Sequence, residues 1–164
     1  MISFLRIERF VEHLADKANW VAAAAVVFIM LLTTADVVLR FFRCPIPGTY
    51  EIVGFIGSAV IAFSLPYTSI QKGHIAVEFV VQRFPWRARV IINIINVSIA
   101  IVLFALIAWQ SVKYAQGLRI TGEVSSTLQM STYPFVYGVA LGCFLLCVVL
   151  LVELFRQLRG AEIE

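Results

Sequence analysis

Three ionisable residues around the first tight turn of the sequence are the first candidates for chemistry. Asp36 and Arg40 stand four residues apart near the end of an apolar stretch, and Glu51 follows a turn that contains Pro45 and Pro47. A carboxylate inside a membrane is costly, which makes Asp36 a candidate ion or proton site. The same spacing also fits an Asp–Arg pair that neutralises itself along one helix. We expect this structural role, with Arg40 and Glu51 meeting across the turn.

The histidines and cysteines do not form the pattern of an enzyme or a metal centre. His13 lies in a charged N-terminal segment and His74 in a predicted loop, so neither is placed to ligate a haem from within a helix. Cys143 and Cys147 stand four apart in an apolar stretch and Cys44 in a turn, which indicates neither disulfides nor zinc ligands. A nucleophile–base pair and a phosphate-binding glycine loop are also missing. We expect no catalysis, cofactor, metal ion or nucleic-acid binding in this chain.

Four long apolar stretches must position these residues. They cover residues 20–39, 52–70, 90–112 and 133–152. A bilayer core of about 30 Å needs about 20 apolar residues, and a backbone in lipid has to satisfy its own hydrogen bonds. Charged residues make up only 14% of the chain, against about 25% in a soluble domain. The sequence predicts one all-α integral membrane domain over 1–164 with four transmembrane helices.

The N-terminal segment 1–19 is amphipathic. Its apolar residues recur three and four positions apart, with charged residues on the other side. This pattern predicts a helix in the plane of the membrane before the first span. Basic residues favour the cytoplasmic side of a membrane. With both termini in the cytoplasm, nine of the 13 Lys and Arg residues fall inside, and those outside are Arg40, Arg43, Lys113 and Arg119.

Small residues mark the faces on which the spans are expected to pack. Gly54 and Gly57 share one side of the second span, and Gly138 and Gly142 stand four apart in the fourth. Small residues allow helix backbones in lipid to approach closely. The short turn after the first span predicts that the first two spans are neighbours, and Thr49 is expected to cap the second.

Several loop motifs, taken together, are typical of one family. The first span ends in Arg40, Phe41 and Phe42, and a proline-rich turn over 45–51 leads to an acidic residue. Residues 73–78 read Gly-His-Ile-Ala-Val-Glu, which is the most specific of these motifs. Over nearly its whole length the sequence resembles the small membrane subunit of a tripartite ATP-independent periplasmic (TRAP) transporter.

The resemblance implies a multi-pass protein of the bacterial inner membrane that works in a complex. In that family the small subunit is a scaffold beside a large membrane subunit, which holds the substrate and sodium sites. A periplasmic binding protein delivers an organic acid to the pair. Arg43 and Arg119 are then candidates for docking of the binding protein. We expect His74 and Glu78 to organise the cytoplasmic loop rather than to perform chemistry.

Two other classes of protein fit the same four spans. One is the membrane anchor subunit of a redox complex, in which a bound haem or quinone would show in the visible spectrum. The other is a small exporter that works as a homodimer, in which this chain alone would carry substrate. The spans contain no central ionisable residue and no paired broken helices, so the sequence favours a chain without its own substrate or sodium site.

Overall fold

Four long α-helices make up the described part of the chain. The computed structural model describes residues 2–71 and 86–161, with side chains over 9–71 and 88–157. Within these residues the helices are α1 (Ile2–Phe41), α2 (Thr49–Ile70), α4 (Trp86–Thr121) and α5 (Tyr133–Ala161). Each helix contains a stretch long and apolar enough to cross a membrane. The all-α class and the four predicted spans are therefore confirmed.

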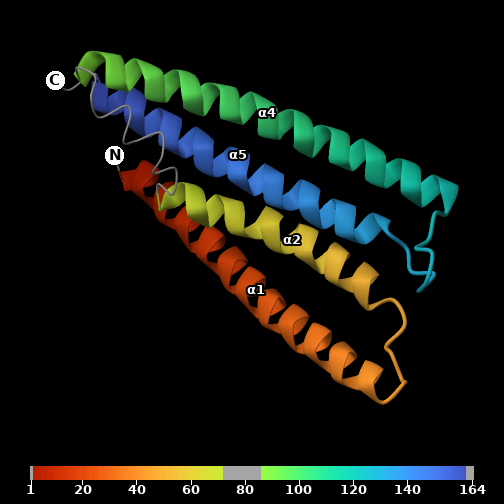
Figure 1. Ribbon diagram of the computed structural model, residues 1–164. Helices are drawn as coiled ribbons and strands as arrows, with labels where there is room; N and C mark the ends of the chain where they lie inside the picture. Colours follow the sequence, from red (N-terminus) through yellow and green to blue (C-terminus); the bar gives the residue numbers. More distant parts are fainter. Residues whose placement is uncertain (1, 72–85, 162–164) are drawn as a thin grey trace.

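The helices lie side by side in a single layer, in the order α1, α2, α5, α4 (Figure 1). Each helix packs chiefly on its neighbours in this row, so α1 contacts α2, α2 contacts α5, and α5 contacts α4. The predicted contact between the first two spans is confirmed. Burial follows the row, since 39% of the most apolar stretch of α5 is buried and none of that of the edge helix α4. Both broad faces of the row are left open.

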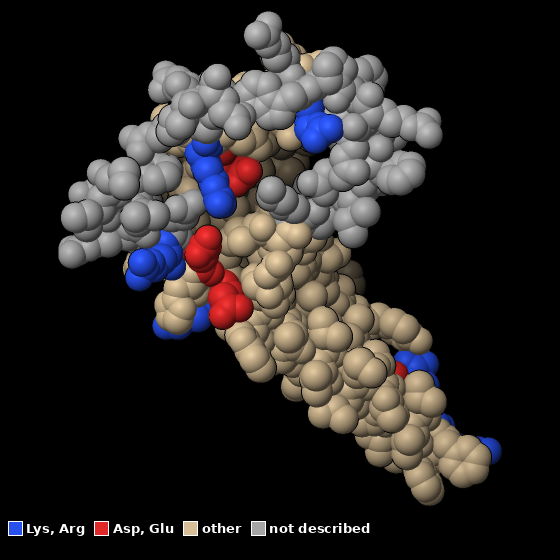
Figure 2. Space-filling model, turned by 90° about the vertical axis from the view of Figure 1, so that its left-hand side faces the viewer, with Lys and Arg blue, Asp and Glu red and all other residues tan. Residues whose placement is uncertain are grey.

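The row has two polar ends and an uncharged middle. The two ends of the described chain lie together at one end of the row, the terminus end, and the loops 42–48 and 122–132 lie at the other, the loop end (Figure 1). The charged side chains visible in Figure 2 gather toward these two ends, with an uncharged band between them. This distribution fits a bilayer-crossing bundle with both termini on one side. That this side is the cytoplasm stays a prediction.

The first helix is longer than the sequence analysis expects. The segment 1–19, expected as a separate in-plane helix, is helical from Ile2 and continues into the first span without a break. No Gly or Pro stands between Ile2 and Phe41 to end the helix. Val11 and Ala15 are buried against Val149 of α5, so this segment packs on the bundle. The described residues therefore show one helix of 40 residues and no separate arm.

The third span is long and unbroken, as predicted. At 36 residues and 1.5 Å per residue, α4 is about 54 Å long. It therefore exceeds a hydrocarbon core of about 30 Å and must tilt or project beyond it. Its last turns carry polar side chains past the start of the loop that leads to α5.

Candidate functional site at the loop end

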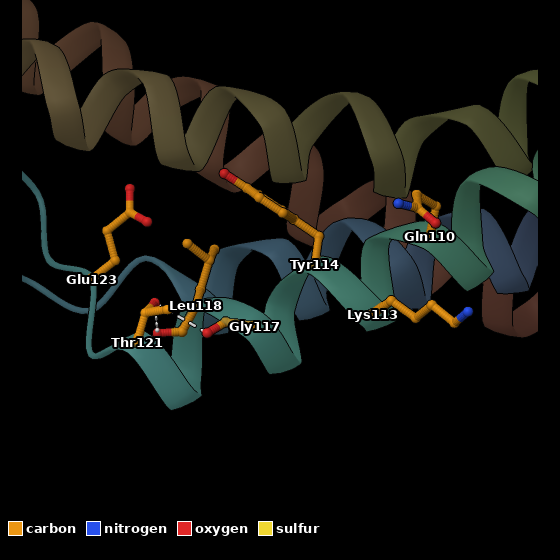
Figure 3. A pocket seen from close by; sticks show the side chains of 7 residues that line it. All are labelled: Gln110, Lys113, Tyr114, Gly117, Leu118, Thr121 and Glu123. Atoms are coloured by element: carbon orange, nitrogen blue, oxygen red, sulfur yellow. Dashed lines mark hydrogen bonds between the residues drawn. The ribbon is translucent and has the colours of Figure 1, made fainter.

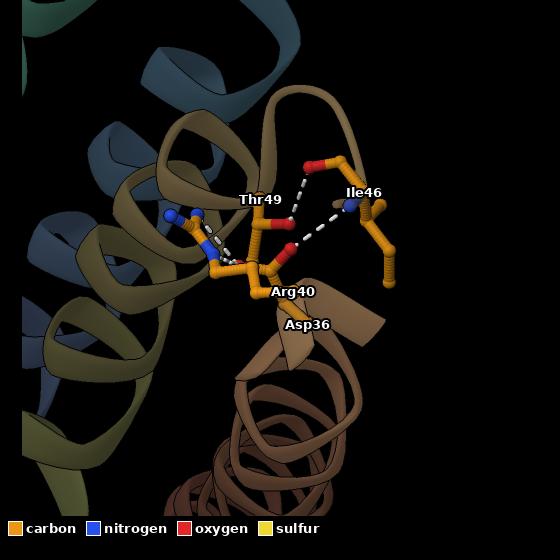
Figure 4. Close-up of polar contacts among 4 residues, drawn as sticks. All are labelled: Asp36, Arg40, Ile46 and Thr49. Atoms are coloured by element: carbon orange, nitrogen blue, oxygen red, sulfur yellow. Dashed lines mark hydrogen bonds and ion pairs between the residues drawn. The ribbon is translucent and has the colours of Figure 1, made fainter. Parts of the chain in front are cut away.

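Asp36 fixes the loop between α1 and α2. Its side chain is 4% exposed. One carboxylate oxygen, Oδ2, accepts hydrogen bonds from the guanidinium of Arg40, with both Nε and Nη2 at 2.8 Å. The other, Oδ1, accepts the backbone N–H of Ile46 at 2.9 Å (Figure 4). The Asp36–Arg40 pair predicted from the spacing is present, and it also holds a loop ten residues along the chain. We call Asp36, Arg40 and Ile46 the Asp36 clamp.

Glu51 holds the other loop at this end, the one that connects α4 to α5. Its carboxylate accepts a hydrogen bond from the Ser125 hydroxyl. It also accepts the backbone N–H of Thr127 at 2.8 Å and that of Leu128 at 3.1 Å. We call these four residues the Glu51 clamp. It ties the first turn of α2 to a segment more than 70 residues away in the sequence.

The expected pairing of Arg40 with Glu51 is wrong. Arg40 bonds to Asp36 and lies over the ring of Tyr50, with its guanidinium carbon 5.2 Å from the ring centroid. Glu51 is instead occupied by the α4–α5 loop. An anion in the first turn of a helix attracts backbone N–H donors from whichever loop folds over it. The only signal for this contact in the sequence is the Ser- and Thr-rich character of that loop.

The two loops meet where Leu128 covers Gly48. Gly48 is the N-cap of α2 and has φ 74°, a left-handed conformation that suits glycine. A Cβ at this position would overlap the side chain of Leu128. The cap was expected at Thr49, which is instead the first residue of α2 and donates its hydroxyl to the Ile46 carbonyl at 3.0 Å. Both loops are thereby joined into one surface at the loop end.

Only one of the four predicted packing glycines makes a close contact within the chain. A Cβ built on Gly142 would lie 2.6 Å from the carbonyl oxygen of Ala62, so α5 approaches α2 closely there. Cβ atoms built on Gly54, Gly57 or Gly138 would meet no described atom within 4 Å. These three glycines leave room for a further backbone to approach the row.

Comparison with known families identifies the kind of protein that carries these clamps. Residues 29–160 match the family described as "Tripartite ATP-independent periplasmic transporters, DctQ component". The chain belongs to the DctQ family. The match contains both clamps and most of each helix that forms the row. No curated protein and no solved structure matches the chain closely enough for comparison.

The DctQ fold places the remaining candidate residues at its surface or beyond the described residues. Arg43 and Arg119 are exposed at the loop end, where Arg43 has φ 60° and Arg119 is in the last turn of α4. His74 and Glu78 lie outside the described residues, so their expected role in the cytoplasmic loop stays a prediction.

Chemically, this DctQ chain offers anchored loops. Asp36 and Glu51 each accept two or more hydrogen bonds from groups of the chain itself, which engages both carboxylates in holding backbone. Over residues 2–71 and 86–161, no group of three or more His, Cys, Asp or Glu side chains could hold a metal ion. Cys143 and Cys147 are buried in α5, and the Cys147 thiol donates weakly to the Ile101 carbonyl at 3.9 Å. Their surroundings are those of small packing residues.

Proposed function

We propose that this chain is the scaffold subunit of a sodium-coupled TRAP transporter in the bacterial inner membrane. A large membrane subunit holds the substrate and sodium sites, and a periplasmic binding protein delivers an organic acid for import. This chain holds the large subunit in place while part of that subunit moves. The family supports the transporter and the subunit role. The import direction, the sodium coupling and the class of substrate belong to the proposal.

The observation that carries the proposal is the single layer of helices. A substrate path has to be enclosed by protein, because polar groups in lipid are costly. Helices in one row enclose no space between them, and each packs chiefly on its neighbours in that row. The described helices also lack the paired broken segments around which transporters build their sites. A partner must therefore supply the path.

Two features of the row suit a fixed support for that partner. The open glycines of α2, Gly54 and Gly57, let another helix approach its backbone on a face that the chain leaves uncovered. The Asp36 and Glu51 clamps fix both described loops at the loop end, so this end does not depend on a partner for its shape. An anchored row beside a moving partner is what scaffold action requires.

Reconstitution tests the proposal directly. The large subunit and the binding protein encoded with this chain are placed in proteoliposomes with and without it, and uptake of radiolabelled organic acids is measured under an inward sodium gradient. We expect uptake only with all three proteins, and loss of uptake when potassium replaces sodium. Full uptake without this chain would overturn the scaffold role. Uptake by this chain alone would show instead that it carries its own path.

A further inference from the structure

A groove opens on α4 at the loop end, where the row ends and no other helix covers α4. Its volume is about 350 Å³. All of its lining comes from the last three turns of α4 and the residue just beyond: Gln110, Lys113, Tyr114, Gly117, Leu118, Thr121 and Glu123 (Figure 3). Gly117 leaves the floor of the groove open, since a Cβ there would meet no described atom within 4 Å.

The groove lies at the level of the lipid headgroups. Arg89 and Lys113 are 24 residues apart on α4, which corresponds to about 36 Å of helix and slightly exceeds a hydrocarbon core of about 30 Å. Trp109, one turn before Lys113, is 65% exposed, as is typical of aromatic residues at a membrane interface. The ammonium of Lys113 lies 5.2 Å from the centre of that ring. Lys113 therefore stands where lipid phosphates lie.

The polar groups of the groove are ordered by charge. Lys113 and Glu123 lie toward opposite ends of it, with Tyr114 between them (Figure 3). Glu123 follows the turn at Gly122, and its backbone N–H donates to the Leu118 carbonyl at 3.3 Å, which brings it back beside the helix. A positive group thus stands nearer the bilayer core and a negative group nearer the water.

An apolar track continues from the groove toward the membrane. Ile99, Leu103, Leu106 and Ile107 precede Gln110 by 11, 7, 4 and 3 residues, so they share its side of the helix. All four side chains are exposed. Acyl chains lying along this track would bring a headgroup to the groove.

We propose that the groove binds a phospholipid of the phosphatidylethanolamine class. The phosphate pairs with Lys113 and accepts from the Gln110 amide, and the primary ammonium donates to Glu123 and to the Tyr114 oxygen. The order of charges follows that of the lipid, in which the phosphate lies below the amine. Phosphatidylglycerol has the same phosphate but no amine, so it gains nothing from Glu123. This assignment does not depend on the proposed function.

Native mass spectrometry of the delipidated full-length chain tests the site. Palmitoyl-oleoyl phosphatidylethanolamine and the matching phosphatidylglycerol are titrated separately, with inorganic phosphate as a competitor. We expect Lys113→Gln to weaken both lipids about tenfold, as for one lost hydrogen bond between charged groups. Glu123→Gln should weaken only phosphatidylethanolamine by about the same factor. Arg119→Gln is the matched control, because Arg119 stands two positions after Gly117 and points away from the groove.

A second variant separates blocking of the groove from loss of charge. Gly117→Leu fills the floor without meeting described atoms, so the fold is retained and both lipids should be lost. Equal binding of the two lipids to the unmodified chain would overturn the proposal, as would equal effects of Lys113→Gln and Arg119→Gln. Effective competition by inorganic phosphate would assign the groove to a soluble anion. Loss of association with the large subunit in Gly117→Leu, at unchanged lipid binding, would assign it to a partner helix.

Discussion

Gly142 of α5 lies against the backbone of Ala62 of α2, and Pro66 explains why the contact forms there. In a regular helix the N–H of residue 66 would bond to the carbonyl of residue 62, but proline has no N–H. The Ala62 carbonyl is thereby freed, and a Cβ on Gly142 would lie 2.6 Å from its oxygen. Close approach of a glycine backbone to an unpaired carbonyl is a stabilising contact in helix packing. The proline of α2 and the glycine of α5 therefore act together.

Replacing Gly142 by valine should separate α2 from α5. The added side chain has to displace the Ala62 backbone, and overpacking of this kind costs about 1–3 kcal/mol. The midpoint of unfolding in an SDS titration should fall accordingly. Gly138→Val is the control, because Gly138 is one turn earlier on α5 and meets nothing within 4 Å. Equal loss of stability in both variants would contradict the close contact.

Asp36→Asn should loosen the loop between α1 and α2. The amide keeps the shape of the side chain but loses the charge that pairs with Arg40, and a hydrogen bond to a charged group contributes about 1.5–3 kcal/mol. We expect a lower melting temperature and faster hydrogen exchange at the Ile46 amide. Asp16→Asn in the same helix should change neither. Unaltered exchange at Ile46 would show that the loop does not depend on the carboxylate.

Glu51→Ala should release the α4–α5 loop while leaving the helices intact. The variant removes the acceptor of the Thr127 and Leu128 amides, so both should exchange faster with solvent in a mass-spectrometric measurement. Circular dichroism should report the same helix content. Glu123→Ala, at an exposed position in the same loop, serves as the control. Protection retained at both amides would mean that other contacts hold the loop.

The parts of this fold that sequence predicts are those fixed by local spacing. Apolar runs of sufficient length determine the four spans, and a spacing of four along one helix determines the Asp36–Arg40 pair. The continuity of α1 was equally local, since the absence of Gly and Pro through residue 41 argued against a break. In that case amphipathicity suggested a separate element, whereas the backbone had no reason to end the helix.

The parts that sequence does not predict depend on which elements meet in space. Glu51 has donors available from more than one loop, and only the folded row brings Ser125 and Thr127 to it. Likewise, a Gly-x-x-x-Gly pattern does not say which glycine faces a neighbour. The carbonyl freed by Pro66 lies level with Gly142 and not with Gly138, a relationship between two helices that neither sequence alone contains.

Both termini are expected on the cytoplasmic side. The chain ends lie at the same end of the row (Figure 1), and the distribution of basic residues gives the side. Single cysteines at positions 13, 43 and 159, in a chain without Cys44, Cys143 and Cys147, test this with a membrane-impermeant maleimide. Position 43 should react from the periplasm, and the other two only after permeabilisation. Periplasmic labelling at 13 or 159 would reverse the orientation.

The exposed cations at the loop end should speed the arrival of the binding protein, a prediction that depends on the proposed function. Arg43 and Arg119 are exposed at the end predicted to face the periplasm. Long-range attraction raises association rates and is screened by salt. In the three-component proteoliposomes, we expect the Arg43→Gln, Arg119→Gln double variant to raise the concentration of binding protein for half-maximal uptake on the order of tenfold at low salt. The difference should shrink at high salt, while the maximal rate stays the same because neither side chain touches a transport site. Lys17→Gln, at the terminus end, is the control for a change in net charge. A lowered maximal rate, or an effect independent of salt, would show that these arginines act through the structure of the loop end and not through steering.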